Sequence, residues 1–585
     1  MESATLPRSP RVIGLRPPGR ALTCVLEIAS EADRAQVAAL RHDVYARELG
    51  QHPVNATGRL GDGLDAYNIV LVARMGGAVA GFVSLTPPRC PAYSIDKYFP
   101  RADLPFSVDD SLFEVRLLTV LPEHRGSEIA LLLMYAALRW VESHGGTHVA
   151  AIGRREVVPL YERVGLRPMG LSARSGAVTY DLLHATATQL RAQAVRLADL
   201  FGRLERHIHW RLSFPFRQPA GCFHGGAFFA AVGEDFQRLE RRHEIINADV
   251  LDAWFDPAPG VLRTLQAEMP WLLRTSPPTA CAGLVETIAR TRGVLPANIL
   301  PGAGSSDLIF RAFTSWLTPR SRVLILDPTY GEYAHVLEHV VGCRVDRLPL
   351  DRAANFAVEP ARLEAAFADG YDLIVLVNPN SPTGRHLPRA TLELMVGGLP
   401  PGTRLWIDET YVEYAGAGQS MEQFAAQSEN IVVCKSMSKV YALSGARVAY
   451  LCAGRHQLEA LRAITPPWVV GLPSQVAAVR ALQDPAYYAG RYRETALARE
   501  ILATGLRGLG WDVLPGIANF LLCHLPASGP DAATVVARAA ARGLFIRNAA
   551  TMGARLGPHA VRVAVKDPAT NRRMIEILHD AADLR

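Results

Sequence analysis

The sequence has no uninterrupted apolar stretch of about 18 residues, the length that a membrane-spanning helix needs. Its first twenty residues are rich in proline and arginine and contain no apolar core, so we do not expect them to be a secretory signal peptide. We therefore expect residues 1–20 to be a disordered tail. We also expect the protein to be cytoplasmic and not to bind a membrane.

Clustered cysteines are lacking too. The eight cysteines are scattered and none forms a C-x-x-C pair, so neither a zinc site nor a disulfide framework is expected. No dense run of basic residues with interleaved aromatics is present, and a net charge of +6 is small for 585 residues. Both features argue against a nucleic-acid partner. With 49% hydrophobic and 20% charged residues, the chain is typical of a globular protein of several domains.

Lysine is the scarcest charged residue. The 62 basic residues include four lysines, which are Lys97, Lys435, Lys439 and Lys566. Arginine cannot replace a lysine that forms an imine, because its guanidinium stays protonated and is a poor nucleophile. Segment 434–447 contains two of the lysines, one helical turn apart, and reads as a strand end and a turn of small residues before Gly445 and Arg447. A lysine in such a turn can bond to an aldehyde cofactor while serines and an arginine hold a phosphate. The lysine count does not choose between Lys435 and Lys439.

The pattern S-x-S-K at residues 436–439, followed by G-x-R at 445–447, strongly resembles class I and II aminotransferases of pyridoxal phosphate (PLP) fold type I. In that family the imine-forming lysine follows S-x-S directly, so the resemblance implies Lys439. It also implies that the cofactor phosphate is held by Ser436, Ser438 and Arg447.

The resemblance extends over residues 219–585, where strand-like and helical segments alternate as in an α/β domain with a mainly parallel sheet. A smaller C-terminal domain is expected over about 475–585. A turn of small residues at 302–310 opens a helix, and its amides and hydroxyls can cradle a phosphate. This turn precedes Lys439 in the family's order of motifs. The resemblance therefore implies that Gly304, Ser305 and Ser306 contact the cofactor.

An apolar strand at 405–407 leads directly into Asp408. A carboxylate that faces the pyridine nitrogen keeps it protonated, so the ring works as an electron sink. The match to the family's D-E-x-Y motif implies this role for Asp408, and a hydrogen bond from Tyr411 to the cofactor's 3′-oxygen.

Two further motifs precede Asp408 in the family's order. A buried strand at 323–327 is followed by Tyr330, which the resemblance places over the pyridine ring as a stacking partner. Residues 378–384 resemble N-P-N-N-P-T-G, but Ser381 stands where the family has an asparagine that bonds the 3′-oxygen. Either Ser381 takes that role or Asn380 reaches in, and we favour Asn380.

The segments 544–547 and 561–565 recur in the branch of histidinol-phosphate aminotransferases and threonine-phosphate decarboxylases. There an arginine holds the substrate carboxylate as a bidentate fork, which implies Arg562. Arg547 either binds a substrate phosphate or acid, or faces solvent from its strand. His224 begins an H-G-G motif like that of the decarboxylase branch, whose arm covers the active site.

The N-terminal residues 21–184 resemble the GNAT (GCN5-related) acyltransferase fold, an α+β domain. The resemblance rests on the order of expected elements, with a strand at 112–120, a turn, and a long helix at 129–143. Amides at that helix start would bind the pyrophosphate of acyl-CoA. Glu128 stands where a glycine is usual and would repel it, which leaves open acyl-CoA, an acyl carrier protein, or a degenerate binding module. A helical linker is expected over 185–218.

Tyr161 lies in a segment that matches the family's L-Y-x-x-x-G pattern, which implies a general acid for the leaving thiolate. A packing tyrosine is the alternative. Residues 40–45 and 113–116 look like the branch of autoinducer synthases and long-chain N-acyl amino acid synthases. There Glu114 is either a base for the acceptor amine or a residue of a half-exposed strand.

Together these patterns predict PLP-dependent transamination of an amino acid or amino-acid phosphate, with a keto acid as the second substrate, fused to N-acyl transfer. The alternative is a decarboxylase of a phosphorylated amino acid with a non-catalytic N-terminal domain. Fold type I sites usually form between two subunits, so the resemblance implies a homodimer in which Tyr333 serves the neighbouring site.

Overall fold

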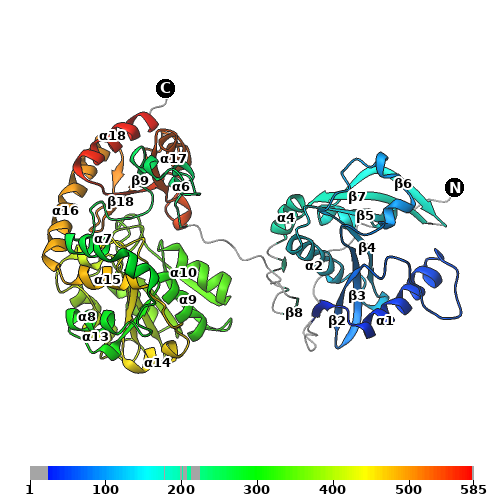
Figure 1. Cartoon of the computed structure of the whole chain (residues 1–585), viewed down its shortest axis with the longest axis horizontal. Coiled ribbons are helices and arrows are strands. Elements are labelled where there is room, and N and C mark those ends of the chain that lie inside the picture. The colour runs from blue at the N-terminus through cyan, green and yellow to red at the C-terminus, as the bar shows by residue number, and fades with distance from the viewer. Residues whose placement is uncertain are drawn as a thin grey trace, which may run out of the picture. The chain divides into compact units, whose positions relative to one another are not determined.

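The computed structural model describes residues 24–582 except 177, 198–199, 202–203, 205–206 and 213–223, so the expected tail at 1–20 lies outside the described residues. The chain divides into two compact units, Met1–Gln218 and Pro219–Arg585, which Figure 1 draws in blue to cyan and in green to red. Within the described part, no helix is long and apolar enough to span a bilayer.

Unit 1 is built on an eight-stranded sheet in the order β6-β7-β5-β4-β3-β2-β1-β8. Its strands are β1 (Cys24–Ile28), β2 (Ile69–Met75), β3 (Ala78–Thr86), β4 (Leu112–Val120), β5 (His148–Arg154), β6 (Arg167–Ser175), β7 (Val178–Thr186) and β8 (Ile208–Arg211). The apolar helix α2 (Ile129–Ser143) packs on the sheet (Figure 1). The parallel strands β4 and β5 pair only over Leu112–Glu114 and separate beyond it.

Local sequence explains the ends of two helices in this unit. Ser30 caps α1 (Glu31–Arg41) and forms a reciprocal capping box with Asp33. Thr186 and Gln189 make the same motif at the start of α4 (Ala187–Arg196). These side chains satisfy backbone amides that the first turn of a helix leaves without partners.

The expected helical linker at 185–218 is only partly helical. It contains α4, but residues 208–211 form β8, which pairs in parallel with β1. Ile208 and Trp210 alternate with polar residues and pack against the apolar cluster of this sheet, and a period of two favours a strand. The helical spacing assigned to the whole segment was therefore wrong at its C-terminal end.

Unit 2 contains a seven-stranded sheet in the order β10-β16-β15-β14-β13-β11-β12. Its strands are β10 (Ile299–Gly302), β11 (Arg322–Asp327), β12 (Arg344–Pro349), β13 (Leu373–Val377), β14 (Arg404–Asp408), β15 (Ile431–Ser436) and β16 (Ala449–Cys452). All neighbours are parallel except β16, which runs antiparallel to β10 and β15. As expected of a sheet covered on both faces, β13 is buried along its whole length.

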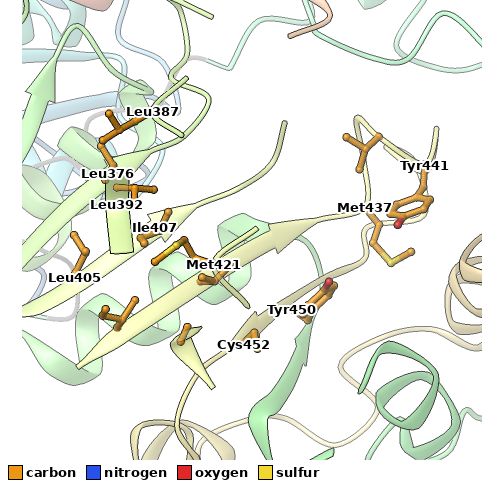
Figure 2. Close-up of a cluster of buried hydrophobic side chains, with 14 of the residues drawn as sticks. Leu376, Leu387, Leu392, Leu405, Ile407, Met421, Met437, Tyr441, Tyr450 and Cys452 are labelled. Carbon is orange, nitrogen blue, oxygen red and sulfur yellow. The ribbon is translucent and has the colours of Figure 1, made fainter. Parts of the chain in front are cut away.

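The side chains of this sheet pack into two apolar clusters. Figure 2 shows part of one, in which Leu376, Leu405 and Ile407 from neighbouring strands lie beside Leu392 of α12 (Arg389–Val396). The other cluster includes Trp406, fully buried and one residue from Ile407. Asp408 is the last residue of β14, so it lies at the carboxyl edge of the sheet. By the same alternation its side chain points to the face on which Trp406 lies.

A second, five-stranded sheet has the order β17-β18-β20-β19-β9. Its strands are β17 (Asp512–Val513), β18 (Phe520–His524), β19 (Leu544–Asn548), β20 (Ala560–Ala564) and β9 (Ile246–Ala248). The helices α16 (Pro485–Gly508), α17 (Ala532–Ala540) and α18 (Pro568–Ala582) pack with it. Because β9 pairs in parallel with β19, a segment from the start of unit 2 completes the C-terminal sheet.

Candidate active site

A cavity of about 790 Å³ opens in unit 2 where the carboxyl ends of four parallel strands meet. The strand-end residues that line it are Asp327, Val377, Asp408 and Ser436. Ligands of α/β sheets bind at this edge. The structure brings to this cavity most of the residues that the sequence singled out, which are His224, Ser305, Ser306, Tyr330, Asp408, Tyr411, Ser436, Ser438, Lys439, Arg447, Arg547 and Arg562.

Asp408 is held from three directions. The hydroxyl of Tyr333 donates to Oδ2 at 2.7 Å, and the amide and hydroxyl of Thr410 donate to Oδ1 at 2.9 and 2.7 Å. Burial raises the pKa of Asp408, and these hydrogen bonds oppose that rise by stabilising the carboxylate. Tyr333 is fully buried and also accepts a bond from the indole N–H of Trp406 at 2.9 Å. The expectation that Tyr333 serves a neighbouring subunit was therefore wrong.

The two neighbouring lysines have different surroundings. Lys435 is 2% exposed, and its Nζ lies 2.7 Å from Glu413, 3.6 Å from Glu409 and 4.0 Å from Glu422. Lys439 lines the cavity, where burial lowers its pKa. The structure thus separates a lysine inside an ion cluster from one that faces the cavity.

The partner of Lys439 is a residue that sequence reasoning missed. Its Nζ donates to Oδ1 of Asp252 at 2.8 Å, and Ser444 Oγ lies at 3.4 Å. Asp252 lies four residues after β9 and far from Lys439 in the sequence, so no motif of fixed spacing links the two.

The phosphate-binding residues meet around Arg447. Gly304 has φ +93°, and a Cβ there would lie 2.3 Å from Nη2 of Arg447, so a side chain at 304 would displace the guanidinium. Ser305 begins α9 (Ser305–Trp316), and amides in the first turn of a helix are suited to bind an anion. Arg447 donates to the carbonyl of Ser444 at 3.3 Å and forms no ion pair with a carboxylate of the described residues.

Tyr330 and Ser306 both bond to Glu332, another residue missed at first. The hydroxyl of Tyr330 donates to Oε2 of Glu332 at 2.7 Å, and Ser306 donates to the same oxygen at 3.0 Å. Burial and the charge of Glu332 raise the pKa of Tyr330. Glu332 is fully buried, lines the cavity, and its Oε1 has no hydrogen-bond partner among the described residues. Nε2 of His224 lies 3.8 Å from Glu332.

The two strand arginines differ in charge balance. Arg562 on β20 donates to Ser381 Oγ at 3.2 Å and to the carbonyl of Asp249 at 3.0 Å, and burial lowers its pKa to about 10. Arg547 on β19 pairs instead with the carboxylate of Asp249 at 2.7 Å. The alternative in which Arg547 faces solvent is therefore wrong.

The preference for Asn380 over Ser381 was wrong. Asn380 is fully buried, and its amide group bonds to Pro328, Thr329 and Thr383. Ser381 lines the cavity and bonds to Arg562. The short side chain at 381 reaches the cavity because the turn directs the larger amide at 380 into the backbone around Pro328.

These residues fit the PLP that the resemblance implies. Asp408 is fixed by hydrogen bonds at a strand end, as a partner for a ring nitrogen requires. The absence of a side chain at Gly304 makes room for the guanidinium of Arg447. This guanidinium forms no ion pair with a described carboxylate, so it can bind a phosphate. The side chain of Lys439 is 17% exposed, carries a lowered pKa and faces the same cavity.

In unit 1, the side chain of Glu114 is enclosed by protein groups. It is fully buried on β4, and its carboxylate accepts bonds from the amides of Ser94 and Ile95 at 2.7 and 3.0 Å and from the Ser94 hydroxyl. Burial raises its pKa. These bonds tie the 93–95 loop to the sheet. The half-exposed strand is therefore wrong at this residue, and the role of Glu114 as a base stays a prediction.

Tyr161 in α3 (Val158–Arg163) packs tightly against the sheet. It is 8% exposed, and a Cβ on Gly153 would lie 2.8 Å from its ring. Burial, together with nearby Tyr45, raises its pKa, so Tyr161 holds its proton at neutral pH. The ring of Tyr161 is therefore a packing group, as the alternative stated. Its role as a general acid stays a prediction.

The turn before α2 carries less positive charge than its sequence indicates. Arg125 donates to both oxygens of Glu48 at 2.6 and 2.7 Å. Glu128 is the N-cap of α2 and makes no side-chain cap bond. Two ion pairs that the sequence did not indicate also stabilise unit 1. Arg41 pairs with Asp65 at 2.7 Å, and Arg116 on β4 pairs with Asp62.

Comparison with known proteins gives two family matches. The model of aminotransferase class I and II matches residues 257–578, and the model of N-acyl amino acid synthase FeeM matches residues 36–188. Histidinol-phosphate aminotransferase of Roseiflexus castenholzii is 31% identical over 343 residues, 58% of this chain and 90% of that protein. The enzyme of the same name from Symbiobacterium thermophilum is 30% identical over 60% of this chain and 93% of that protein.

Solved structures share the fold. Histidinol-phosphate aminotransferase from Sinorhizobium meliloti in complex with pyridoxal-5′-phosphate covers 63% of this chain and 95% of its own, at a TM-score of 0.54 and 23% identity. Aspartate aminotransferase from Thermus thermophilus with maleate covers 62% of this chain and 100% of its own, at 0.52 and 20%. Because the first family match spans more than half of the sequence, this chain belongs to the class I and II aminotransferases, and its N-terminal region matches the model of N-acyl amino acid synthase FeeM.

Proposed function

We propose that unit 2 transfers an amino group from an amino acid to a keto acid with PLP, and that unit 1 acylates an amine. The observation that carries the first part is the arrangement of Lys439 and Asp408 in one cavity with two arginines, Arg447 and Arg562, that no described carboxylate neutralises. Two anion sites suit one cofactor phosphate and one substrate carboxylate.

PLP supplies an electron-withdrawing ring that stabilises negative charge at the substrate α-carbon. Asp408 would hold the proton on the ring nitrogen, since the hydrogen bonds from Tyr333 and Thr410 stabilise its carboxylate and fix its position. Arg562 orients the substrate by its carboxylate. Nζ of Lys439, with its lowered pKa, takes the proton from the α-carbon as a general base. Asp252 accepts a hydrogen bond from this Nζ and limits its movement.

The test is the absorption spectrum of the purified protein, wild type against Lys439→Ala, followed by addition of an amino donor. We expect a visible band that depends on Lys439, and conversion to a pyridoxamine band with formation of a keto acid. Released CO₂ without a keto acid would instead identify the alternative, a decarboxylase. A protein that stays colourless with excess PLP would contradict both.

For unit 1 we propose N-acyl transfer from an acyl carrier protein in preference to acyl-CoA. The support is the pairing of Arg125 with Glu48 and the position of Glu128, which leave the turn poorly charged for a pyrophosphate. Titration of the full-length protein with acyl-CoA and with acyl carrier protein compares the two donors. Saturable binding of neither would favour a non-catalytic module.

We propose further that the two units act in one pathway, so that unit 2 makes or consumes an amine that unit 1 acylates. The support is their fusion in one chain. The test supplies each unit with the other's product, and acceptance of neither product would end this proposal.

We also propose a homodimer, as fold type I relatives imply, in a reducing compartment such as the cytoplasm. The seven described cysteines are free thiols, as proteins of that compartment keep them. Light scattering of the purified protein measures the oligomeric state.

A further inference from the structure

The cavity contains more cations than its anion sites require, and carboxylates cancel some of them. Five lysine or arginine side chains line it, which are Arg347, Lys439, Arg447, Arg547 and Arg562. Arg347 pairs with Glu338 at 2.7 Å, and Lys439 pairs with Asp252 at 2.8 Å. Arg547 pairs with Asp249 at 2.7 Å. Only Arg447 and Arg562 form no ion pair with a described carboxylate.

The pair of Arg547 and Asp249 is enclosed. The side chains are 10% and 6% exposed, and Nη2 of Arg547 also donates to the carbonyl of His224 at 2.6 Å. Oδ2 of Asp249 accepts a bond from the amide of Gly226 at 3.0 Å. A Cβ on Gly225 would lie 2.3 Å from Nη2 of Arg547, so this glycine lets the arm close over the pair. Arg547 is thus held by protein groups rather than presented to a ligand.

The carboxylate of Glu332 also disfavours binding of a ligand anion near Arg547. Glu332 is fully buried and lines the cavity, and its Oε1 has no partner within the described chain. The imidazole of His224 lies 3.8 Å from Glu332. The backbone carbonyl of His224 accepts a hydrogen bond from Arg547. A group that approached Arg547 past His224 would therefore meet a buried negative charge, which is weakly screened in such a site.

We propose that the amino donor carries one acid group, its α-carboxylate, and that Asp249 sets this specificity by neutralising Arg547. The inference rests on the proposed transamination and narrows its substrate class. Of the two arginines that no described carboxylate pairs with, Arg447 serves the cofactor phosphate and Arg562 the α-carboxylate. Amino acids with neutral side chains fit, whereas dicarboxylic amino acids and amino-acid phosphates lack a second cation.

The test measures binding of two matched anions to the PLP-loaded full-length protein by calorimetry. Butyrate has one carboxylate, and succinate has two on the same number of carbons. In the wild type we expect the dissociation constants to agree within about threefold, as for a second charge that gains no partner. In Asp249→Asn, which keeps the bond from Gly226, we expect succinate to gain about tenfold over butyrate because no carboxylate then compensates the charge of Arg547.

The matched control is Asp346→Asn. Asp346 pairs with Arg322 at 3.0 Å outside the cavity lining, so its loss should leave the ratio unchanged. A wild type that binds succinate at least tenfold more tightly than butyrate would overturn the proposal, and so would an unchanged ratio in a folded Asp249→Asn. The wild-type ratio alone decides if that variant does not fold.

Failure of this inference and failure of the proposed function look different. If the wild type forms the visible band and transfers amino groups fastest from dicarboxylic or phosphorylated donors, only the specificity is wrong. If no donor reacts and no band forms, the proposed transamination is wrong, and the two dissociation constants still report the charge of the cavity.

Discussion

Tyr333 and Asp408 are joined by a hydrogen bond of 2.7 Å between a hydroxyl and a carboxylate that are both almost completely buried. The bond reaches Asp408 from the core side of the sheet, since Tyr333 also contacts Trp406. A residue from the helix after Tyr330 therefore stabilises the charged form of Asp408 and opposes the rise in its pKa that burial causes.

Tyr333→Phe removes this bond and leaves the indole N–H of Trp406 without its acceptor. We expect the pKa of Asp408 to rise further and the affinity for PLP to fall by about tenfold, in line with about 1–3 kcal/mol for a lost bond to a buried charged group. Equilibrium titration with PLP measures this. Tyr371→Phe is the control, because its hydroxyl bonds Asp346 at 3.3 Å away from the cavity. Equal affinities of the two variants would contradict the role given to Tyr333.

Lys439→Ala and Lys435→Met separate the two neighbouring lysines. The first should abolish the visible band and leave thermal stability nearly unchanged. The second should keep the band but lower stability by about 3–5 kcal/mol, because Glu409, Glu413 and Glu422 lose a buried counter-charge. Calorimetric unfolding and absorption spectra of both variants give the two readouts. A band that persists in Lys439→Ala and disappears in a folded Lys435→Met would reverse the assignment.

The ion cluster around Lys435 predicts a pH dependence. Burial raises the pKa of Glu409 from an ordinary value of 4.5 to about 7. The folded chain therefore binds this proton more tightly than the unfolded chain. The group's contribution to stability is complete below about pH 4.5 and is lost as the pH rises to about 7, by at most about 1.4 kcal/mol per pH unit.

Glu409→Gln removes the titrating group and keeps acceptor and donor atoms for Met421 and Ser420. We expect the melting temperature of this variant to change less between pH 5 and 7 than that of the wild type, and to exceed it at pH 8. Scanning calorimetry across this range measures both curves. Parallel curves would show that Glu409 does not titrate there.

Glu48→Gln tests the charge of the turn before α2. Loss of the Glu48 carboxylate frees Arg125 for a phosphate, so the affinity for acyl-CoA should rise by about threefold to tenfold. Stability should change by less than about 1 kcal/mol, because the pair is solvent-exposed. The control is Asp181→Asn, which frees Arg155 on another part of unit 1. The same gain in both variants would mean that Arg125 has no special place in donor binding.

Much of the cavity was predictable because its residues sit in motifs of fixed spacing. Asp408 follows an apolar strand, and Lys439 follows a turn of serines, so sequence alone placed both at strand ends. Charge balance was not predictable in the same way. Asp249 and Asp252 come from a segment far from Arg547 and Lys439 in sequence, and only the pairing of β9 with β19 brings them near.

In unit 1, the order of elements was predictable but the contacts of single side chains were not. Alternation along β4 indicated a strand. The loop at 93–95, which encloses Glu114, has no sequence pattern from which its position could be predicted. The choice between Asn380 and Ser381 failed for a similar reason. Which of two adjacent polar side chains enters a cavity depends on the turn around them, and both choices fit the motif.

The parallel pairing of β8 with β1 decides where a stand-alone fragment of unit 1 can end. A truncation after residue 184, where the resemblance stopped, would strip β1 of its outer neighbour and expose a row of unpaired backbone amides and carbonyls. Such a fragment would tend to aggregate by strand addition, whereas one that extends through Arg211 keeps this flank covered.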